Sequence, residues 1–308
     1  MPSRRIAFSV RLKYIGRCTI RRLVFPPERR LSPEDNTNGA KIPEKLPMKV
    51  LVFENPGRAA DSVAAEVLEA LRQKPELVLG LATGSTPIGV YSRWIRAHQE
   101  QGVDFSHVTT FNLDEYLGLP ADHKQSYRHF MYKYLFGGLD IPSSRIHFPP
   151  TTGSDPGLEC GKYEEMIRQA GGVDIQILGI GSNGHLGFNE PTSSLASRTR
   201  IVTLSYKTLR DNSRFYGPLE EQPQMAATMG IGTILEAKRI FLQAFGLRKA
   251  DAVHAAIEGP VSAFWPGSAL QLHPDVTFFL DPQSASKLSL LEYYRRAAEN
   301  EARLRGNS

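Results

Sequence analysis

Residues 77–95 read LVLGLATGSTPIGVYSRWI, an apolar run followed by a Gly-Ser-Thr-Pro turn and a stretch whose apolar residues have helical spacing. The run 77–82 predicts a buried strand, and the spacing over 88–95 predicts a helix. A strand that passes through a short turn into a helix is the repeating unit of a parallel α/β sheet. This stretch therefore indicates the α/β class.

The same alternation continues on both sides of this stretch. Apolar runs predict strands at 49–53, 77–82, 107–111, 174–180, 239–245 and 276–280, and helical periods predict helices near 58–73, 87–101, 125–136, 157–170, 248–258 and 287–304. We expect an α/β fold, formed as a single domain by residues 48–308: a doubly wound, mostly parallel, Rossmann-like sheet with helices on both faces.

Residues 1–47 differ in character from the rest of the chain. They have repeated prolines, no hydrophobic period, and eleven Lys/Arg against four Asp/Glu, a formal charge of +7. We expect a basic, Pro-rich, disordered extension or a stretch upstream of a start at Met48; a transit peptide or a nucleic-acid-binding arm is the alternative. Because the whole chain carries +5, residues 48–308 carry −2, and we expect no nucleic-acid partner.

Composition excludes several classes of protein. A chain of 308 residues with 41% hydrophobic and 22% charged residues can bury a full core. No run approaches the roughly 18 apolar residues that a membrane span needs, so no membrane partner is expected. Cys18 and Cys160 cannot form a disulfide framework, and the eight histidines are scattered. We expect a cytoplasmic protein without a metal or another cofactor.

Ligands of open α/β sheets bind beyond the carboxyl ends of the strands, so the turns at these ends are the first candidates for a site. In the turn after 77–82, Thr86 fits the N-cap of the next helix and Pro87 its first position. The backbone amides of Gly84, Ser85 and Thr86 then suit a phosphate at the helix N-terminus. An ordinary capped turn explains the same residues.

The motif FNLDEY at 111–116 places Asp114 and Glu115 directly after a predicted strand. A carboxylate held in a crevice can act as a general base near neutral pH. Because adjacent residues of an extended chain point in opposite directions, we expect at most one to face a substrate. A solvated pair that caps the following helix is the alternative.

The loop 179–191 reads GIGSNGHLGFNEP and satisfies G-x-G-x-x-G. A dinucleotide site is excluded, since no amphipathic helix follows and no acid occurs from 191 to 210. We interpret His185 as a proton-transfer group, with Asn183 beside it and Glu190 folded back to orient the imidazole. A structural role is the alternative for any single histidine.

Two cations could reach an anion at this edge, Arg214 and Lys249. A single Arg or Lys usually forms a surface ion pair, so the residues by themselves do not establish an anion-binding role for either one. No G-x-S-x-G elbow or Cys-His pair indicates covalent acyl chemistry. Proton transfer on a phosphorylated small molecule is the chemistry that these residues permit.

From Met48 to the C-terminal helix, the motifs together resemble those of the glucosamine-6-phosphate deaminases. The resemblance rests on ATGSTP (82–87), FNLDEY (111–116), GHLGFNEP (184–191), SSLASRTR (193–200) and LQLHP (270–274). It implies a metal-independent conversion of glucosamine 6-phosphate and water to fructose 6-phosphate and ammonia, a hydrolytic deamination coupled to an aldose-ketose isomerisation.

The resemblance also implies roles for single residues. Asp114 matches the base that moves a proton between C2 and C1, and His185 matches the group that assists ring opening, with Glu190 orienting it. The phosphate site would comprise Gly84, Ser85, Thr86, Arg214 and Lys249.

Asn183 stands where many members have Asp, and Asn cannot take a proton; either Glu190 supplies the charge beside His185, or ring opening depends on His185 alone. The activator site of allosteric members would use Ser193, Arg200 and Thr203, but Val202 replaces one of its lysines. Allosteric activation and the family's homo-hexamer are expectations of the resemblance only.

Two rival functions remain open on the sequence. A 6-phosphogluconolactonase would share the fold and the sugar-phosphate crevice, but it does not predict Asp114-Glu115 together with His185 and Glu190. A non-enzymatic sugar-phosphate sensor would need residues 1–47 as a DNA-binding head, and they are too Pro-rich for a helix-turn-helix.

Overall fold

The computed structural model describes residues 48–120, 122–152, 155–206, 209–210 and 222–306. The chain separates into two units, Met1–Glu44 and Lys45–Ser308, and all described residues lie in the second. The expected extension 1–47 lies outside the described residues.

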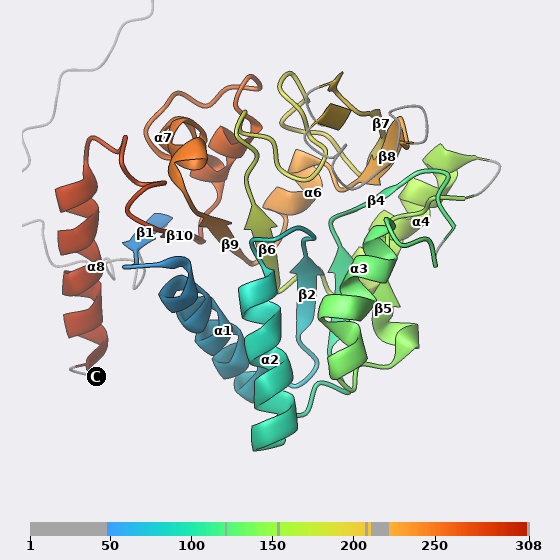
Figure 1. Ribbon diagram of the computed structural model, residues 1–308, viewed down its shortest axis with the longest axis horizontal. Helices are drawn as coiled ribbons and strands as arrows, with labels where there is room; N and C mark the ends of the chain where they lie inside the picture. The colour runs from blue at the N-terminus through green and yellow to red at the C-terminus, as the bar shows by residue number, and fades with distance from the viewer. Residues whose placement is uncertain (1–47, 121, 153–154, 207–208, 211–221, 307–308) are drawn as a thin grey trace, which may run out of the picture. The chain divides into compact units, whose positions relative to one another are not determined.

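A seven-stranded sheet forms the centre of the described unit, and every strand pairs in parallel with its neighbours (Figure 1). Its spatial order is β1-β10-β9-β6-β2-β3-β5. The strands are β1 (Met48–Val52), β2 (Val78–Leu81), β3 (Thr109–Asn112), β5 (Ile146–His147), β6 (Ile175–Gly179), β9 (Arg239–Ala244) and β10 (Val276–Leu280). The chain runs outward from β2 to β5 and then returns to β6, so the order reverses between β2 and β6. Such a switch point is where open α/β sheets bind ligands.

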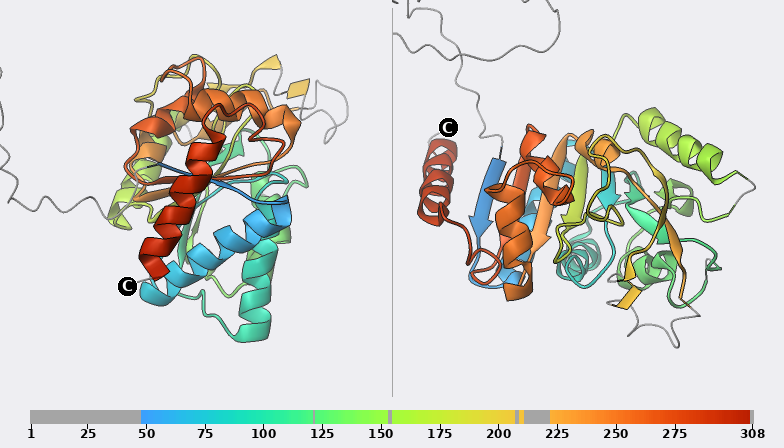
Figure 2. Two further views of the ribbon diagram at one scale, coloured as in Figure 1. Left: turned by 90° about the vertical axis from the view of Figure 1, so that its left-hand side faces the viewer. Right: turned by 90° about the horizontal axis from the view of Figure 1, so that it is seen from above.

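Helices cover both faces of this sheet, as the view along it in Figure 2 shows. One buried cluster packs α1, α2 and α3 on one face, and another packs α4, α6 and α7 on the other. The helices are α1 (Pro56–Gln73), α2 (Ile88–Gln101), α3 (Tyr127–Tyr134), α4 (Pro156–Gln169), α6 (Ile231–Leu235), α7 (Ala250–Ile257) and α8 (Leu291–Gly306), with shorter 3-10 turns η1 (Phe136–Gly138), η2 (Ser143–Arg145), η5 (Leu247–Lys249) and η6 (Pro266–Leu272). The predicted doubly wound α/β class is confirmed.

Gly80 interrupts the apolar run that begins the decisive stretch, and packing between strands explains it. The side chain of Gln176 on β6 occupies the space where a Cβ on Gly80 would lie. Any larger residue at this position of β2 would displace the amide of Gln176.

A second, three-stranded antiparallel sheet was not predicted from the sequence. It has the order β4-β8-β7, formed by β4 (Asp114–Tyr116), β8 (Met225–Thr228) and β7 (Arg200–Thr203). Strands this short, with polar residues among them, have no clear period-2 signal. This sheet fixes the position of Asp114, because that residue begins β4.

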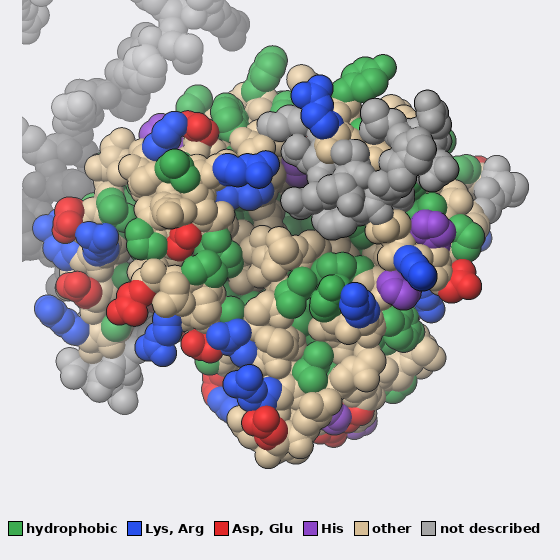
Figure 3. All heavy atoms as spheres, viewed as in Figure 1, with side chains coloured by type: hydrophobic (Ala, Val, Ile, Leu, Met, Phe, Trp, Pro, Cys, Tyr) green, Lys and Arg blue, Asp and Glu red, His purple; other side chains and the backbone are tan. Residues whose placement is uncertain are grey.

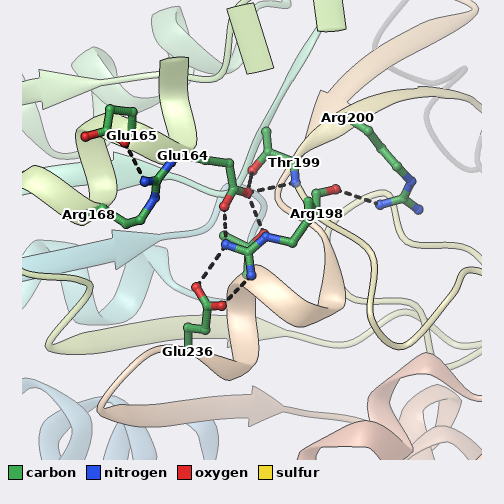
Figure 4. Close-up of polar contacts among 8 residues, drawn as sticks. Glu164, Glu165, Arg168, Arg198, Thr199, Arg200 and Glu236 are labelled. Atoms are coloured by element: carbon green, nitrogen blue, oxygen red, sulfur yellow. Dashed lines mark hydrogen bonds and ion pairs between the residues drawn. The ribbon is translucent and has the colours of Figure 1, made fainter. Parts of the chain in front are cut away.

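The segment before β7 is anchored by a buried carboxylate (Figure 4). Glu164 on α4 accepts hydrogen bonds from the Thr199 backbone N–H at 2.8 Å and the Thr233 hydroxyl at 2.6 Å. Arg198 joins Glu164 to Glu236. Burial by itself would raise the pKa of Glu164, but hydrogen bonds from Thr199, Thr233 and Arg198 outweigh burial and hold it below 4.5.

We therefore expect Glu164→Gln to destabilise the protein by about 2 kcal/mol at neutral pH. Because the folded-state pKa is depressed, the contribution of Glu164 is present above its unfolded value and is lost as the pH falls through the folded value. Thermal unfolding from pH 7 down to pH 3 should show the gap between variant and wild type closing below about pH 4.5. Glu165→Gln is the matched control: Glu165 makes a half-exposed pair with Arg168, which is worth little. Equal destabilisation by Glu164→Gln and Glu165→Gln would contradict the anchoring role of Glu164.

Candidate active site

Asp114 lies at the rim of the switch point and is almost completely buried, at 5% exposure. The preceding residue, Leu113, donates its backbone N–H to Leu81 at the end of β2, and its carbonyl accepts the N–H of Met229. These two hydrogen bonds of Leu113 hold the chain where it passes from the seven-stranded sheet to the three-stranded sheet. Burial, and secondarily the charge of Glu115, raises the pKa of Asp114 well above 3.8. A carboxylate in this environment is a stronger base than one in water.

Glu115 points the other way from β4 and has a different role. Its carboxylate accepts the backbone N–H groups of Tyr116, Tyr127 and Arg128 at 2.8, 2.8 and 2.7 Å, the last two belonging to the first turn of α3. Burial raises the pKa of Glu115, and these hydrogen bonds oppose the rise. The alternative of a solvated pair that caps the next helix therefore applies to Glu115 only in part: Glu115 caps α3 but is buried, and Asp114 is left for the crevice.

The imidazole of His185 lies against the backbone of Gly181 in the loop that follows β6. A Cβ on Gly181 would lie 2.5 Å from His185 Nε2. The loop closes on itself through bonds from the Gly181 N–H to the His185 carbonyl at 2.9 Å and from the Gly184 N–H to the Gly181 carbonyl at 3.0 Å. The second and third glycines of the rejected G-x-G-x-x-G pattern thus have another role in this loop: Gly181 makes room for the imidazole, and Gly184 donates to the Gly181 carbonyl.

Glu190 does fold back toward His185. Its Oε2 lies 3.6 Å from His185 Nδ1, beyond hydrogen-bond length but within ion-pair range when the imidazole is protonated. Asn183 Nδ2 donates to the same Oε2 at 2.8 Å. Asn183 therefore holds the carboxylate by its amide rather than sharing a proton with it.

The His185 loop is fastened to the sheet that carries Asp114. Arg200, Thr228 and Asp114 form one row across β7, β8 and β4. Thr228 Oγ1 accepts the Phe188 N–H at 3.2 Å, and Arg200 Nη1 donates to Asn189 Oδ1 at 2.8 Å.

Gly187 lies where the His185 loop approaches the three-stranded sheet that carries Asp114. A Cβ on this residue would lie 3.1 Å from Asp114 Oδ2 and 2.9 Å from Thr228 Oγ1, so only glycine lets the loop approach this row. Its φ of 57° is also one that glycine adopts at little cost. The structure therefore brings Asp114 next to the loop of His185 and Glu190. Thr228 and Gly187 were missed because cross-strand register has no signal in a single sequence.

The Gly84-Ser85-Thr86 turn faces solvent at the start of α2. Gly84 has a φ of 101°, which favours glycine. The predicted N-cap is wrong: Pro87 is the N-cap, and no side chain caps the helix. Because Pro87 lies at the N-cap rather than inside the helix, the helix begins one residue later than expected. Among the described residues no hydrogen bond reaches the backbone amides of Ser85 and Thr86, which leaves them available to an anion.

Tyr127 links this turn to the His185 loop. Burial raises the pKa of its phenol well above 10, and the side chain of Thr83, at the start of the turn, opposes this rise. Its ring stacks on Phe188 with centroids 5.8 Å apart. The charge of Asp114 also raises the pKa of Tyr127, so Asp114 lies near this phenol.

Of the two predicted cations, Lys249 reaches the switch point. Its Nζ donates to the Ile180 carbonyl at 2.6 Å, near the start of the His185 loop. Arg214 lies outside the described residues.

The three residues predicted for an activator site are divided in the structure. Arg200 Nη2 donates to Ser193 Oγ at 3.2 Å, and burial lowers the pKa of Arg200. Thr203 ends β7 with its side chain exposed.

Gly181→Ala is expected to lower turnover by about a hundredfold with little change in thermal stability. The new Cβ would occupy the position of the imidazole, which turns aside because the side chain yields more easily than the backbone. Turnover and melting temperature of the variant check this. Gly179→Ala is the control, because a Cβ there meets nothing within 4 Å. Wild-type turnover in Gly181→Ala would show that the imidazole is not needed in this position.

Fold and site together define a class: an α/β protein with acid-base groups at the switch point of a parallel sheet, beside a helix N-terminus that suits an anion. A model of the family described as glucosamine-6-phosphate isomerases/6-phosphogluconolactonase matches residues 56–278. The chain belongs to this family.

Comparison with individual relatives shows which members of the family this chain resembles. A glucosamine-6-phosphate deaminase of Hahella chejuensis is 52% identical over 259 residues, covering 84% of this chain and 99% of that protein. One of Thermoanaerobacter pseudethanolicus is 47% identical over 78% of this chain and 94% of that protein. The solved structure of a monomeric glucosamine-6-phosphate deaminase has a TM-score of 0.75 at 44% identity, covering 78% of this chain and 99% of that one. A 6-phosphogluconolactonase of Trypanosoma cruzi, at 21% identity and a TM-score of 0.61, shares the fold.

Proposed function

We propose that this protein converts glucosamine 6-phosphate and water to fructose 6-phosphate and ammonia. The observation that carries the proposal is the approach of the buried Asp114 carboxylate to the loop of His185 and Glu190 in a chain about half identical to glucosamine-6-phosphate deaminases. A base with a raised pKa beside an imidazole suits an isomerisation that moves protons between carbon and oxygen.

In the proposed reaction, His185 delivers a proton to the ring oxygen as the C1 hydroxyl loses one, which opens the pyranose. Asp114 then removes the proton from C2 and returns it to C1, while a proton passes from the amine nitrogen to O1, which leaves a hydroxyl at C1 and an imine at C2. Water adds to C2, and ammonia departs from the same carbon. The Gly84–Thr86 amides, the N-terminus of α2 and Lys249 hold the phosphate, which keeps C1 and C2 over the carboxylate. Arg214 joins this phosphate set as a prediction.

The deciding experiment supplies glucosamine 6-phosphate to the purified full-length chain and measures ammonia and fructose 6-phosphate. Formation of both in equal amounts is expected. A parallel assay with 6-phosphogluconolactone tests the lactonase alternative. Hydrolysis of the lactone without release of ammonia would overturn the proposal.

Three further features stay predictions. The homo-hexamer is one of them, since a solved relative at 44% identity is a monomeric deaminase. Activation through Ser193, Arg200 and Thr203 is another. Cytoplasmic location is the third; the helices among the described residues are too short or too polar to cross a membrane.

On the face seen in Figure 3, Lys/Arg and Asp/Glu side chains are interspersed among the described residues.

A further inference from the structure

The Glu190 carboxylate is held by a neutral donor on each of its two oxygens. Asn183 Nδ2 donates to Oε2 at 2.8 Å, and Ser205 Oγ donates to Oε1 at 2.9 Å. The Glu190 side chain is mostly buried, with 16% of it exposed. Hydrogen bonds to a partly buried charge are stronger than those between neutral groups.

Ser205 reaches Glu190 from a different part of the fold. It follows β7 by two residues, whereas Asn183 and Glu190 belong to the loop after β6. The sequence separation of fifteen residues has no motif that would reveal the contact. Only the docking of the loop on the small sheet brings the two side chains together.

The two donors set the plane of the carboxylate. With Oε1 and Oε2 each bonded, rotation about the last side-chain bond of Glu190 would break both contacts. Oε2 is thereby kept 3.6 Å from His185 Nδ1, where it can stabilise the protonated imidazole. Without the Ser205 hydroxyl, the carboxylate can turn Oε2 away from the ring.

We propose that Ser205 is a positioning residue for His185 and acts through the carboxylate of Glu190. This inference rests on the proposed function, since it assigns Ser205 to the same proton-transfer site.

Steady-state kinetics of ammonia release from glucosamine 6-phosphate test the inference in three variants. Ser205→Ala is expected to lower kcat by about tenfold, the size of one hydrogen bond to a charged group, while KM stays within about twofold. Ser205→Thr retains the hydroxyl and is expected to restore kcat to within about twofold of wild type. Ser194→Ala is the control, because Ser194 is exposed and its hydroxyl accepts the N–H of Ala196 at 3.3 Å, away from Glu190.

A double-mutant cycle separates positioning from a structural role. If Ser205 acts through Glu190, Ser205→Ala causes no further loss of kcat in a Glu190→Ala background. An equal loss in both backgrounds, a wild-type kcat for Ser205→Ala, or a loss that Ser205→Thr does not restore would each overturn the inference.

One readout does not depend on turnover. The nitrogen resonances of the His185 imidazole, followed by NMR in ¹⁵N-histidine-labelled protein without substrate, are expected to change in Ser205→Ala and to stay unchanged in Ser194→Ala. Unchanged resonances in Ser205→Ala would refute the positioning role even if the wild-type protein failed to release ammonia. Absence of ammonia from the wild-type protein would instead contradict the proposed function.

Discussion

Replacing Asp114 with asparagine is expected to lower kcat by at least about a hundredfold while fructose 6-phosphate still binds with near wild-type affinity. An amide cannot take the C2 proton, whereas the phosphate contacts lie on other segments of the chain. Initial rates of ammonia release and calorimetric titration with fructose 6-phosphate measure the two properties separately.

The same variant should be more stable than the wild type at neutral pH. The folded-state pKa of Asp114 is raised, so the folded protein holds this proton above pH 3.8, where the unfolded chain loses it. The folded protein therefore loses stability as the pH rises from 3.8 to the folded-state pKa of Asp114. Asparagine carries no charge and removes this cost, and we expect the melting temperature at pH 7 to rise by a few degrees, roughly 2–4 °C.

Glu115→Gln is the matched control for Asp114→Asn. Its amide nitrogen would face a backbone N–H of α3, so we expect a loss of about 1–2 kcal/mol in stability, with turnover within about tenfold of wild type. The opposite pattern, in which Glu115→Gln loses turnover and Asp114→Asn keeps it, would identify Glu115 as the base.

Replacing His185 with alanine is expected to lower turnover of the cyclic substrate by a hundredfold or more. The loss should be smaller for an analogue fixed in the open-chain form, because ring opening is the step assigned to the imidazole. Comparison of kcat/KM for the two compounds in wild type and variant gives this difference. Equal losses on both compounds would argue against a role in ring opening.

Six of the seven strands of the large sheet were predictable because each lies in a short, mostly apolar run, as is typical of strands in a covered parallel sheet. The seventh, β5, was missed because it has only two residues, Ile146 and His147, which are too few to form such a run. The runs beginning near 77 and 276 correspond to β2 and β10 within one or two residues. Helix starts were less certain: Thr86 has a side chain that favours the N-cap, yet Pro87 lies there. Local preferences for caps are weak, and the packing of the helix decides its first residue.

Candidate site residues were visible where chemistry is concentrated in a strand-end turn. Asp114 and Glu115 could be found as a pair, and strand geometry predicted that they diverge. Which of the two faces the crevice depended on α3, whose first amides bind the Glu115 carboxylate. Thr228 and Ser205 had no signal, since each acts through a contact with a distant segment.

The sequence by itself determined the α/β class, the parallel sheet and the chemical groups at its carboxyl edge, because these follow from local hydrophobic periods and from the turns that end them. The tertiary structure alone decided which of those groups meet. Asp114 approaches the His185 loop because a small antiparallel sheet pairs 114–116 with 226–228 and because Gly187 has no side chain to hold them apart. Such contacts depend on register and close packing between segments far apart in the chain, and neither leaves a periodic pattern within one segment.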